Sequence, residues 1–146
     1  MTSDRDRPHL VGVHHLGFSV TSLERSIRFY CDVLGADLWR EPYDGDSPSF
    51  SGRMALVSLG GLGLDLFKHQ RNGAEGFDAA RTGLDHFALA SQSLEELLGW
   101  ASWLDACAVA RSEIRSLDGD IGAMFDFVDP DGIQMEFIYV DQAKLV

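Results

Sequence analysis

The chain has 146 residues, which is enough for one domain with its own core and too few for two independent domains. Lys and Arg number 12 against 23 Asp and Glu, and the formal net charge of −11 argues against nucleic acid and anionic membranes as partners. No stretch approaches the roughly 18 apolar residues of a membrane span, and the polar start MTSDRDRPHL does not resemble a signal peptide, so a cytoplasmic protein is expected.

The first half of the chain opens with an apolar strand pattern at residues 13 to 20. A helix follows, and its expected capping box pairs Thr21 with Glu24. Apolar residues mark the helix face that would pack on a sheet, namely Leu23, Ile27, Tyr30 and Leu34. Three short apolar runs with Gly and Pro punctuation then predict three strands, at residues 36–41, 54–59 and 62–67.

The second half repeats this order of elements. A strand pattern at residues 84 to 91 leads into a helix whose expected capping box pairs Ser93 with Glu96. Three further apolar runs predict strands, at residues 108–114, 123–128 and 133–138. We therefore expect an α+β fold in which two βαβββ modules in one chain form a curled mixed sheet.

The segments between these elements define the expected organisation of the single domain. Module 1 covers about residues 11–67 and module 2 about residues 83–140, joined by a linker at 68–82 that is rich in Gly and charge. Residues 40–52 and 115–122 also have the composition of loops. We expect the first of these loops to be a mobile cover over a pocket rather than part of the core.

The two halves carry polar residues at equivalent places. A shift of 71 residues, which carries His15 onto His86, also carries Asp65 onto Glu136 without a gap. The sequence therefore places one histidine and one carboxylate in each half, at matching positions of matching strands.

Strand alternation predicts which way these side chains face. His15 shares a face with Gly17 and Ser19, whereas His14 falls on the bulky face that a helix would cover, so we expect His14 to be a packing residue. Asp65 and Glu136 also alternate against bulky residues. Two imidazoles and two carboxylates on a face lined by small residues predict a metal site with room for a substrate.

The quoted residues resemble the vicinal oxygen chelate superfamily, which includes glyoxalase I, methylmalonyl-CoA epimerases, extradiol dioxygenases, fosfomycin-resistance transferases and bleomycin-resistance proteins. The similarity covers about residues 11 to 140, and its most specific segments are HHLGFSVTSLERSIRFYCDVLGADL and DPDGIQMEF. The resemblance implies a glyoxalase-like fold around a divalent metal. It places His15, His86 and Glu136 at ligand positions and Asp65 at the position of a fourth ligand, which is usually the longer Glu.

The leading functional hypothesis is a metal-dependent lyase or isomerase acting on a small substrate with vicinal oxygens. The cation (Fe, Mn, Ni, Co or Zn) would act as a Lewis acid, with Glu136 or Asp65 as candidate catalytic bases. Two His and one carboxylate also form the iron site of ring-cleaving extradiol dioxygenases, which is the chemical alternative. A non-enzymatic alternative is an antibiotic-binding protein of the bleomycin-resistance type.

Assembly is the last expectation from the sequence. A content of 45% hydrophobic residues, with three Trp, is high for two thin sheets with an open face, so we expect a homodimer. The two modules that enclose the metal can meet within one chain or between two, and the sequence does not decide between these arrangements.

Overall fold

The first module forms one four-stranded sheet covered by a helix. The computed structural model describes residues 8–145. The elements of the first module are β1 (His15–Ser19), α1 (Leu23–Arg28), the π-helical turn η1 (Phe29–Val33), β2 (Asp37–Ser47), β3 (Phe50–Leu59) and β4 (Leu62–His69). The strand order is β1-β4-β3-β2, with β1 parallel to β4 and the other pairs antiparallel.

The second module has the same topology. Its elements are β5 (Phe87–Ala90), α2 (Leu94–Ala106), β6 (Arg115–Ser116), the 3₁₀ turn η2 (Asp118–Asp120), β7 (Gly122–Val128) and β8 (Gln134–Val140), followed by the 3₁₀ turn η3 (Gln142–Lys144). The strand order β5-β8-β7-β6, with β5 parallel to β8, matches that of the first sheet. The predicted α+β class and the two βαβββ modules are confirmed.

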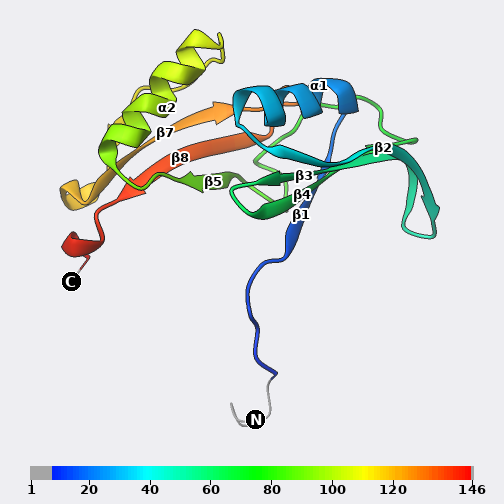
Figure 1. Cartoon of the computed structure of the whole chain (residues 1–146), viewed down its shortest axis with the longest axis horizontal. Helices are drawn as coiled ribbons and strands as arrows, with labels where there is room; N and C mark the ends of the chain where they lie inside the picture. The colour runs from blue at the N-terminus through cyan, green and yellow to red at the C-terminus, as the bar shows by residue number, and fades with distance from the viewer. Residues whose placement is uncertain (1–7, 146) are drawn as a thin grey trace.

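Both main helices lie on one side of the sheets. Figure 1 shows α1 and α2 above the strands, with the two modules side by side and the start of the chain leading away on the opposite side. We call the side of the two sheets that neither α1 nor α2 covers the open face. Any group that projects from the open face lies outside the helix-packed core.

The core forms where the alternating apolar residues of each sheet meet its helix. In β4, Leu64 and Leu66 are fully buried while Asp65 between them is partly exposed. In the second sheet the buried set is Phe125, Phe127, Met135 and Phe137, packed near Leu97, Ala101 and Leu104 of α2. Since burial of a large apolar side chain contributes about 1.5–3 kcal/mol, this pattern fixes the register of the strands and so places the open-face residues.

Contacts between the modules make their relative placement specific. The rings of Phe18 and Phe87 lie 6.1 Å apart, so the edge strands β1 and β5 share one core. Trp103 Nε1 donates a 2.7 Å hydrogen bond to the carbonyl oxygen of Val33. These contacts join β1 to β5 and η1 to α2 on the helix-covered side.

A polar contact also ties α1 to the turn before β8. Asp131 accepts hydrogen bonds from the backbone N–H and the hydroxyl of Thr21, and it pairs with Arg25 at 2.7 Å. Because the backbone N–H and the hydroxyl of Thr21 bind Asp131, the N-cap of α1 is Ser22, whose Oγ accepts a hydrogen bond from the Arg25 N–H. The predicted cap at Thr21 is therefore wrong by one residue, whereas Ser93 caps α2 as expected.

Three local predictions are also wrong. Residues 40–52 form most of a β-hairpin, with only Pro48 and Ser49 between β2 and β3, rather than an irregular loop. The predicted strand at 108–114 is reduced to one bridge between Arg111 and Phe127, and the short strand β6 falls within the predicted loop at 115–122. Gly and Pro residues suggested loops here, but edge strands and their bulges accept both residues.

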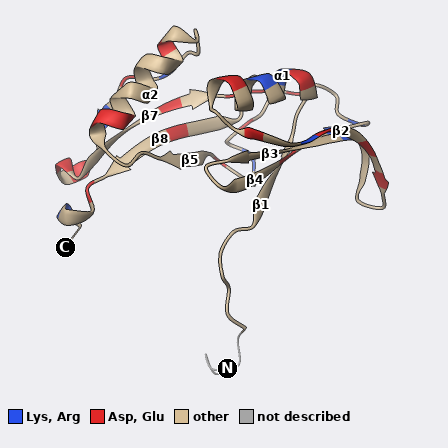
Figure 2. Cartoon of the chain, in the orientation of Figure 1, with Lys and Arg blue, Asp and Glu red and all other residues tan. Residues whose placement is uncertain are grey.

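The surface charge follows the acidic composition. Figure 2 shows Asp and Glu on both helices and on both sheets, with fewer Lys and Arg among them. Among residues 8–145, no helix has the length and apolar character needed to cross a membrane.

Candidate metal centre

The first candidate pair lies on β1 and β4. His15 is opposite Gly63 and Gly17 is opposite Asp65 in the parallel ladder, so His15 and Asp65 project from adjacent positions of the open face. His15 Nε2 lies 3.6 Å from Asp65 Oδ2, with side-chain exposures of 51% and 22%. A Cβ atom at Gly63 would approach the Cβ of His15 to 3.2 Å, so glycine here gives the imidazole its space.

The second candidate pair lies at the equivalent place of the other sheet. Ala88 is opposite Glu136, and His86 directly precedes β5. His86 Nε2 lies 3.8 Å from Glu136 Oε2, with side-chain exposures of 42% and 11%. Each module therefore brings one imidazole Nε2 close to one carboxylate oxygen, at separations longer than a hydrogen bond.

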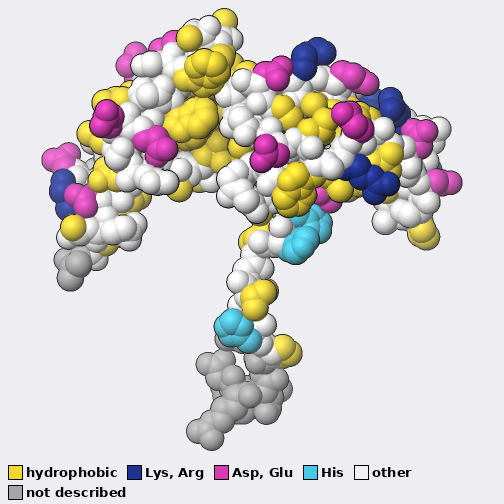
Figure 3. All heavy atoms as spheres, in the orientation of Figure 1, with side chains coloured by type: hydrophobic (Ala, Val, Ile, Leu, Met, Phe, Trp, Pro, Cys, Tyr) yellow, Lys and Arg dark blue, Asp and Glu magenta, His cyan; other side chains and the backbone are white. Residues whose placement is uncertain are grey.

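The other ring nitrogen of each histidine contacts the preceding residue. His15 Nδ1 lies 2.9 Å from Nδ1 of His14, and His86 Nδ1 lies 2.6 Å from Oδ1 of Asp85. The packing role predicted for His14 is wrong, because β1 begins only at His15 and residue 14 is exposed. Figure 3 shows histidine side chains on the surface where the N-terminal segment joins the body.

The surroundings of His86 favour its protonated form. The pKa of His86 is raised mainly by the hydrogen bond to Asp85, against an opposing effect of desolvation, and the charges of Glu136 and Asp126 raise it further. Three carboxylates thus act on this one imidazole. A site so rich in negative charge suits a cation.

The two pairs do not converge within one chain. Across residues 8–145, no three side chains of His, Cys, Asp or Glu stand close enough together to hold one metal ion. The structure thus brings together His15 with Asp65 and His86 with Glu136, but not all four.

The sequence did not predict two residues that lie close to Glu136, Asp126 and Arg115. Asp126 is directly opposite Glu136 in the β7–β8 ladder and so shares its face. Arg115 Nη2 donates to Asp126 Oδ2 at 2.6 Å, and both side chains remain partly exposed. The alternation of Asp126 against buried Phe125 and Phe127 is a signal that would have placed this carboxylate on the open face.

The open face of the first sheet is more apolar. Leu56 is opposite Asp65, and Met54 is opposite Phe67, so apolar side chains continue from the candidate ligand along the same face. On β2, the guanidinium of Arg40 lies 3.6 Å from the ring centroid of Tyr43. The open face of the first sheet is therefore apolar beside Asp65, in contrast to the charged side chains beside Glu136 on the second sheet.

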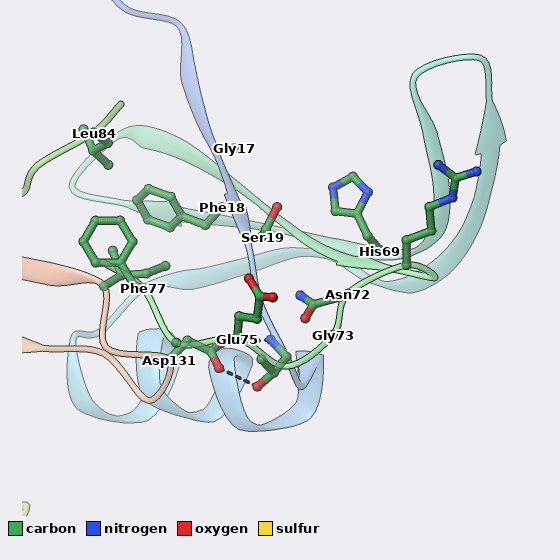
Figure 4. Close-up of a pocket in the computed structure, with 14 residues that line it drawn as sticks. Gly17, Phe18, Ser19, His69, Asn72, Gly73, Glu75, Phe77, Leu84 and Asp131 are labelled. Atoms are coloured by element: carbon green, nitrogen blue, oxygen red, sulfur yellow. Dashed lines mark hydrogen bonds between the residues drawn. The ribbon is translucent and has the colours of Figure 1, made fainter. Parts of the chain in front are cut away.

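A cavity of about 660 Å³ lies at the end of β1, under the segment that links the modules. Figure 4 shows Phe18, Phe77 and Leu84 toward one end and Ser19, His69, Asn72 and Glu75 toward the other. His69, which falls in the linker predicted at residues 68–82, is the last residue of β4 and packs on Phe50. None of the four candidate ligands lines this cavity, although Gly17, the cross-strand partner of Asp65, does.

Comparison with known proteins agrees with the topology. The model of the family described as the Glyoxalase/Bleomycin resistance protein/Dioxygenase superfamily matches residues 12–137. The metallothiol transferase FosB of Staphylococcus haemolyticus is 29% identical over 125 residues, covering 86% of this chain and 81% of FosB.

Two solved structures have the same fold. A glyoxylase/bleomycin resistance protein/dioxygenase domain from Frankia sp. EAN1pec superposes with a TM-score of 0.81 at 28% identity, covering 92% of this chain and 95% of that one. The fosfomycin resistance protein FosX of Listeria monocytogenes superposes with a TM-score of 0.67 at 16% identity, covering 94% and 100%.

Proposed function

Because the chain belongs to the glyoxalase/bleomycin resistance protein/dioxygenase superfamily, we propose that it is a divalent-metal-dependent enzyme, acting as a lyase or isomerase on a small substrate with vicinal oxygens. The observation that carries the proposal is the repeated pair of one imidazole and one carboxylate on the open face of each module. Similarity to a transferase of the same superfamily supports an enzyme in general.

The donor atoms suit a divalent transition metal. Imidazole nitrogen and carboxylate oxygen are the usual ligands of Fe, Mn, Ni, Co and Zn. Metal-to-ligand distances of about 2.0–2.2 Å allow one cation to touch both atoms of a pair separated by less than about 4 Å. Glu136 is buried, and buried carboxylates in proteins are usually paired or coordinate a metal.

We propose that a homodimer completes the site. Since the two pairs lie apart in one chain, a twofold axis that brings His15 and Asp65 of one copy to His86 and Glu136 of the other would form two equivalent four-residue sites. This arrangement also covers the open faces of both sheets. The alternative that the sequence left open, closure within one chain, has no support from the placement of these pairs.

Each group has a distinct role in this proposal. The bound cation would polarise a substrate carbonyl and stabilise the oxyanion that forms. Glu136 and Asp65 are candidates for moving a proton next to that carbonyl. Arg115, held by Asp126, has further guanidinium donors for an anionic oxygen group of the substrate. Met54, Leu56 and Phe67 would exclude water from the opposite side.

A second candidate is transfer of a thiol to such a substrate. The identity to FosB and the placement of Arg115 for an anionic group favour this reaction. The extradiol dioxygenase hypothesis has less support, because the proximity of Asp65 to His15 suggests a fourth ligand rather than a three-residue iron site. The antibiotic-binding alternative predicts drug affinity without turnover.

The experiment that tests the proposal is metal analysis of the protein purified without chelators, followed by activity screening with the identified metal. We expect about one divalent transition metal per chain, and turnover of an α-hydroxycarbonyl substrate that depends on it. A protein that takes up no metal at micromolar concentrations would overturn the proposal.

A further inference from the structure

We propose that His14 and Asp85 are positioning residues which hold the Nδ1 atoms of His15 and His86, so that each imidazole is left with Nε2 as its metal-binding atom. The inference rests on the proposed function in taking His15 and His86 as ligands. It goes beyond that function by assigning a role to two exposed residues that sequence analysis had given to packing or left unassigned.

The contact at His86 defines the tautomer by the chemistry of its partner. An ionised carboxylate only accepts hydrogen bonds, so Asp85 Oδ1, 2.6 Å from His86 Nδ1, requires a proton on Nδ1. In the neutral imidazole, Nε2 then carries the lone pair. That atom is the one directed toward Glu136, at 3.8 Å.

The contact at His15 has the same geometry with a different acceptor. The two Nδ1 atoms of His14 and His15 lie 2.9 Å apart, so one ring donates and the other accepts. When His14 is the acceptor, His15 carries its proton on Nδ1, and its Nε2 is free toward Asp65 at 3.6 Å. The rings meet edge to face, with an interplanar angle of 86°.

The two contacts occupy equivalent positions of the repeat. The shift that carries His15 onto His86 carries His14 onto Asp85, so both modules use the residue directly before the histidine. Neighbouring residues inside a regular strand point to opposite faces and do not meet. They meet here because residues 14 and 85 lie outside β1 and β5, where the backbone leaves the ladder.

Neither residue has an evident structural task. His14 and Asp85 are both exposed, and the one side-chain hydrogen bond that each makes within residues 8–145 is to the following histidine. Removing either side chain should therefore leave folding unchanged. A hydrogen bond to the second ring nitrogen typically changes metal affinity by about 10–100-fold, because it fixes ring orientation and ligand basicity.

The test compares Zn²⁺ affinity, measured by competition with a chelator, for the wild-type protein and the variants Asp85→Ala, Asp85→Asn, His14→Ala and His14→Gln. We expect about 10–100-fold weaker binding for the two Ala variants and recovery of most of the loss in Asn and Gln, which retain an acceptor oxygen. The loss should be greater for Asp85, since a carboxylate acceptor makes its histidine the more basic ligand.

Two matched control variants test whether the effect depends on the position of the side chain or only on the loss of its charge or ring. Glu95→Ala removes the same charge as Asp85→Ala but lies on α2, away from the open face, and His9→Ala removes an exposed imidazole from the N-terminal segment. Both controls should bind Zn²⁺ like the wild type.

Equal losses of Zn²⁺ affinity in Asp85→Asn and Asp85→Ala would mean that Asp85 acts only through its charge, and would overturn its positioning role. Unchanged affinity in both Ala variants would overturn the inference as a whole.

A second readout needs no metal. Imidazole ¹⁵N shifts of the apo protein at pH 8 report which ring nitrogen carries the proton. We expect His86 as the Nδ1–H tautomer in the wild type and as the commoner Nε2–H tautomer in Asp85→Ala. If the wild type bound no Zn²⁺ while this change of tautomer occurred, the proposed function would fail and the contact would stand. An Nε2–H tautomer in the wild-type protein would refute the role of Asp85 directly.

Discussion

The hydroxyl of Tyr30 donates a 3.0 Å hydrogen bond to Oδ2 of Asp129, and both residues are buried between the modules. Asp129 Oδ1 accepts from the backbone N–H groups of Asp131 and Ile133, which shapes the turn into β8. Burial raises the pKa of the Asp129 carboxyl, and these hydrogen bonds oppose the rise. The relationship connects the first helical segment to the strand that carries Glu136.

The variant Tyr30→Phe tests this connection. It leaves Asp129 Oδ2 without its buried donor, which should lower the free energy of unfolding by about 1–3 kcal/mol. Urea denaturation followed by circular dichroism measures the change. Tyr139→Phe serves as a control, because its hydroxyl makes no hydrogen bond within residues 8–145. Equal losses in the two variants would contradict a specific role of the Tyr30 hydroxyl.

His86→Ala and Glu136→Gln should each remove most of the bound metal, because each removes a ligand from a site with only three or four. Elemental analysis of protein purified without chelator measures the metal content. His9→Ala is the control variant, because His9 lies in the N-terminal segment, whereas His14 contacts His15. Metal retained at wild-type stoichiometry in His86→Ala would remove His86 from the ligand set.

Asp65→Ala should retain most of the metal and lose turnover in the lyase or isomerase. In the proposed site three other ligands would anchor the cation, and Asp is one methylene shorter than the Glu expected at this position, so we expect Asp65 to contribute more to the chemistry than to metal affinity. Metal content and turnover are measured on the same preparation. Unchanged aerobic turnover of a catechol in this variant would favour the dioxygenase instead.

A mixture of His15→Ala and His86→Ala chains distinguishes a site between copies from a site within one chain. In the mixed dimer, one of the two sites combines the intact His86 of the first variant with the intact His15 of the second. After unfolding and refolding together, the mixture should recover about a quarter of the wild-type metal, since half of the dimers are mixed and each has one complete site. No recovery, or a monomer mass by light scattering at every concentration, would contradict the dimer.

Arg115→Met should weaken the binding of an anionic chelating probe, oxalate, to the Mn²⁺-loaded protein by roughly tenfold or more, since a hydrogen bond to a charged group contributes about 1.5–3 kcal/mol. Arg115→Lys should keep part of the oxalate affinity, because the Lys ammonium retains the positive charge but lacks the forked donors of a guanidinium. Calorimetry measures both. If Mn²⁺ affinity falls as much as oxalate affinity, Arg115 serves the metal site and not the substrate.

Strand alternation predicted the open-face positions of His15, Asp65 and Glu136 because it depends only on the local pleat and on burial of the intervening residues. The same rule failed at His14, where the ladder has not yet begun. Strand alternation also could not predict how the two modules pack together, because contacts such as that between Phe18 and Phe87 join chain segments far apart in sequence. Residues 40–52 were predicted to be a loop from their Pro and Gly content, but they form a β2–β3 hairpin because cross-strand pairing outweighs that local preference.

The long hairpin has a consequence for solubility. β2 is the outer strand of its sheet, and eleven residues of unpaired edge would ordinarily invite edge-to-edge aggregation. Its register shifts between Leu38 and Tyr43, and Pro42 interrupts the row of backbone donors. The acidic side chains of Glu41, Asp44 and Asp46 repel a second copy of the same edge. These features of the edge disfavour self-association along β2.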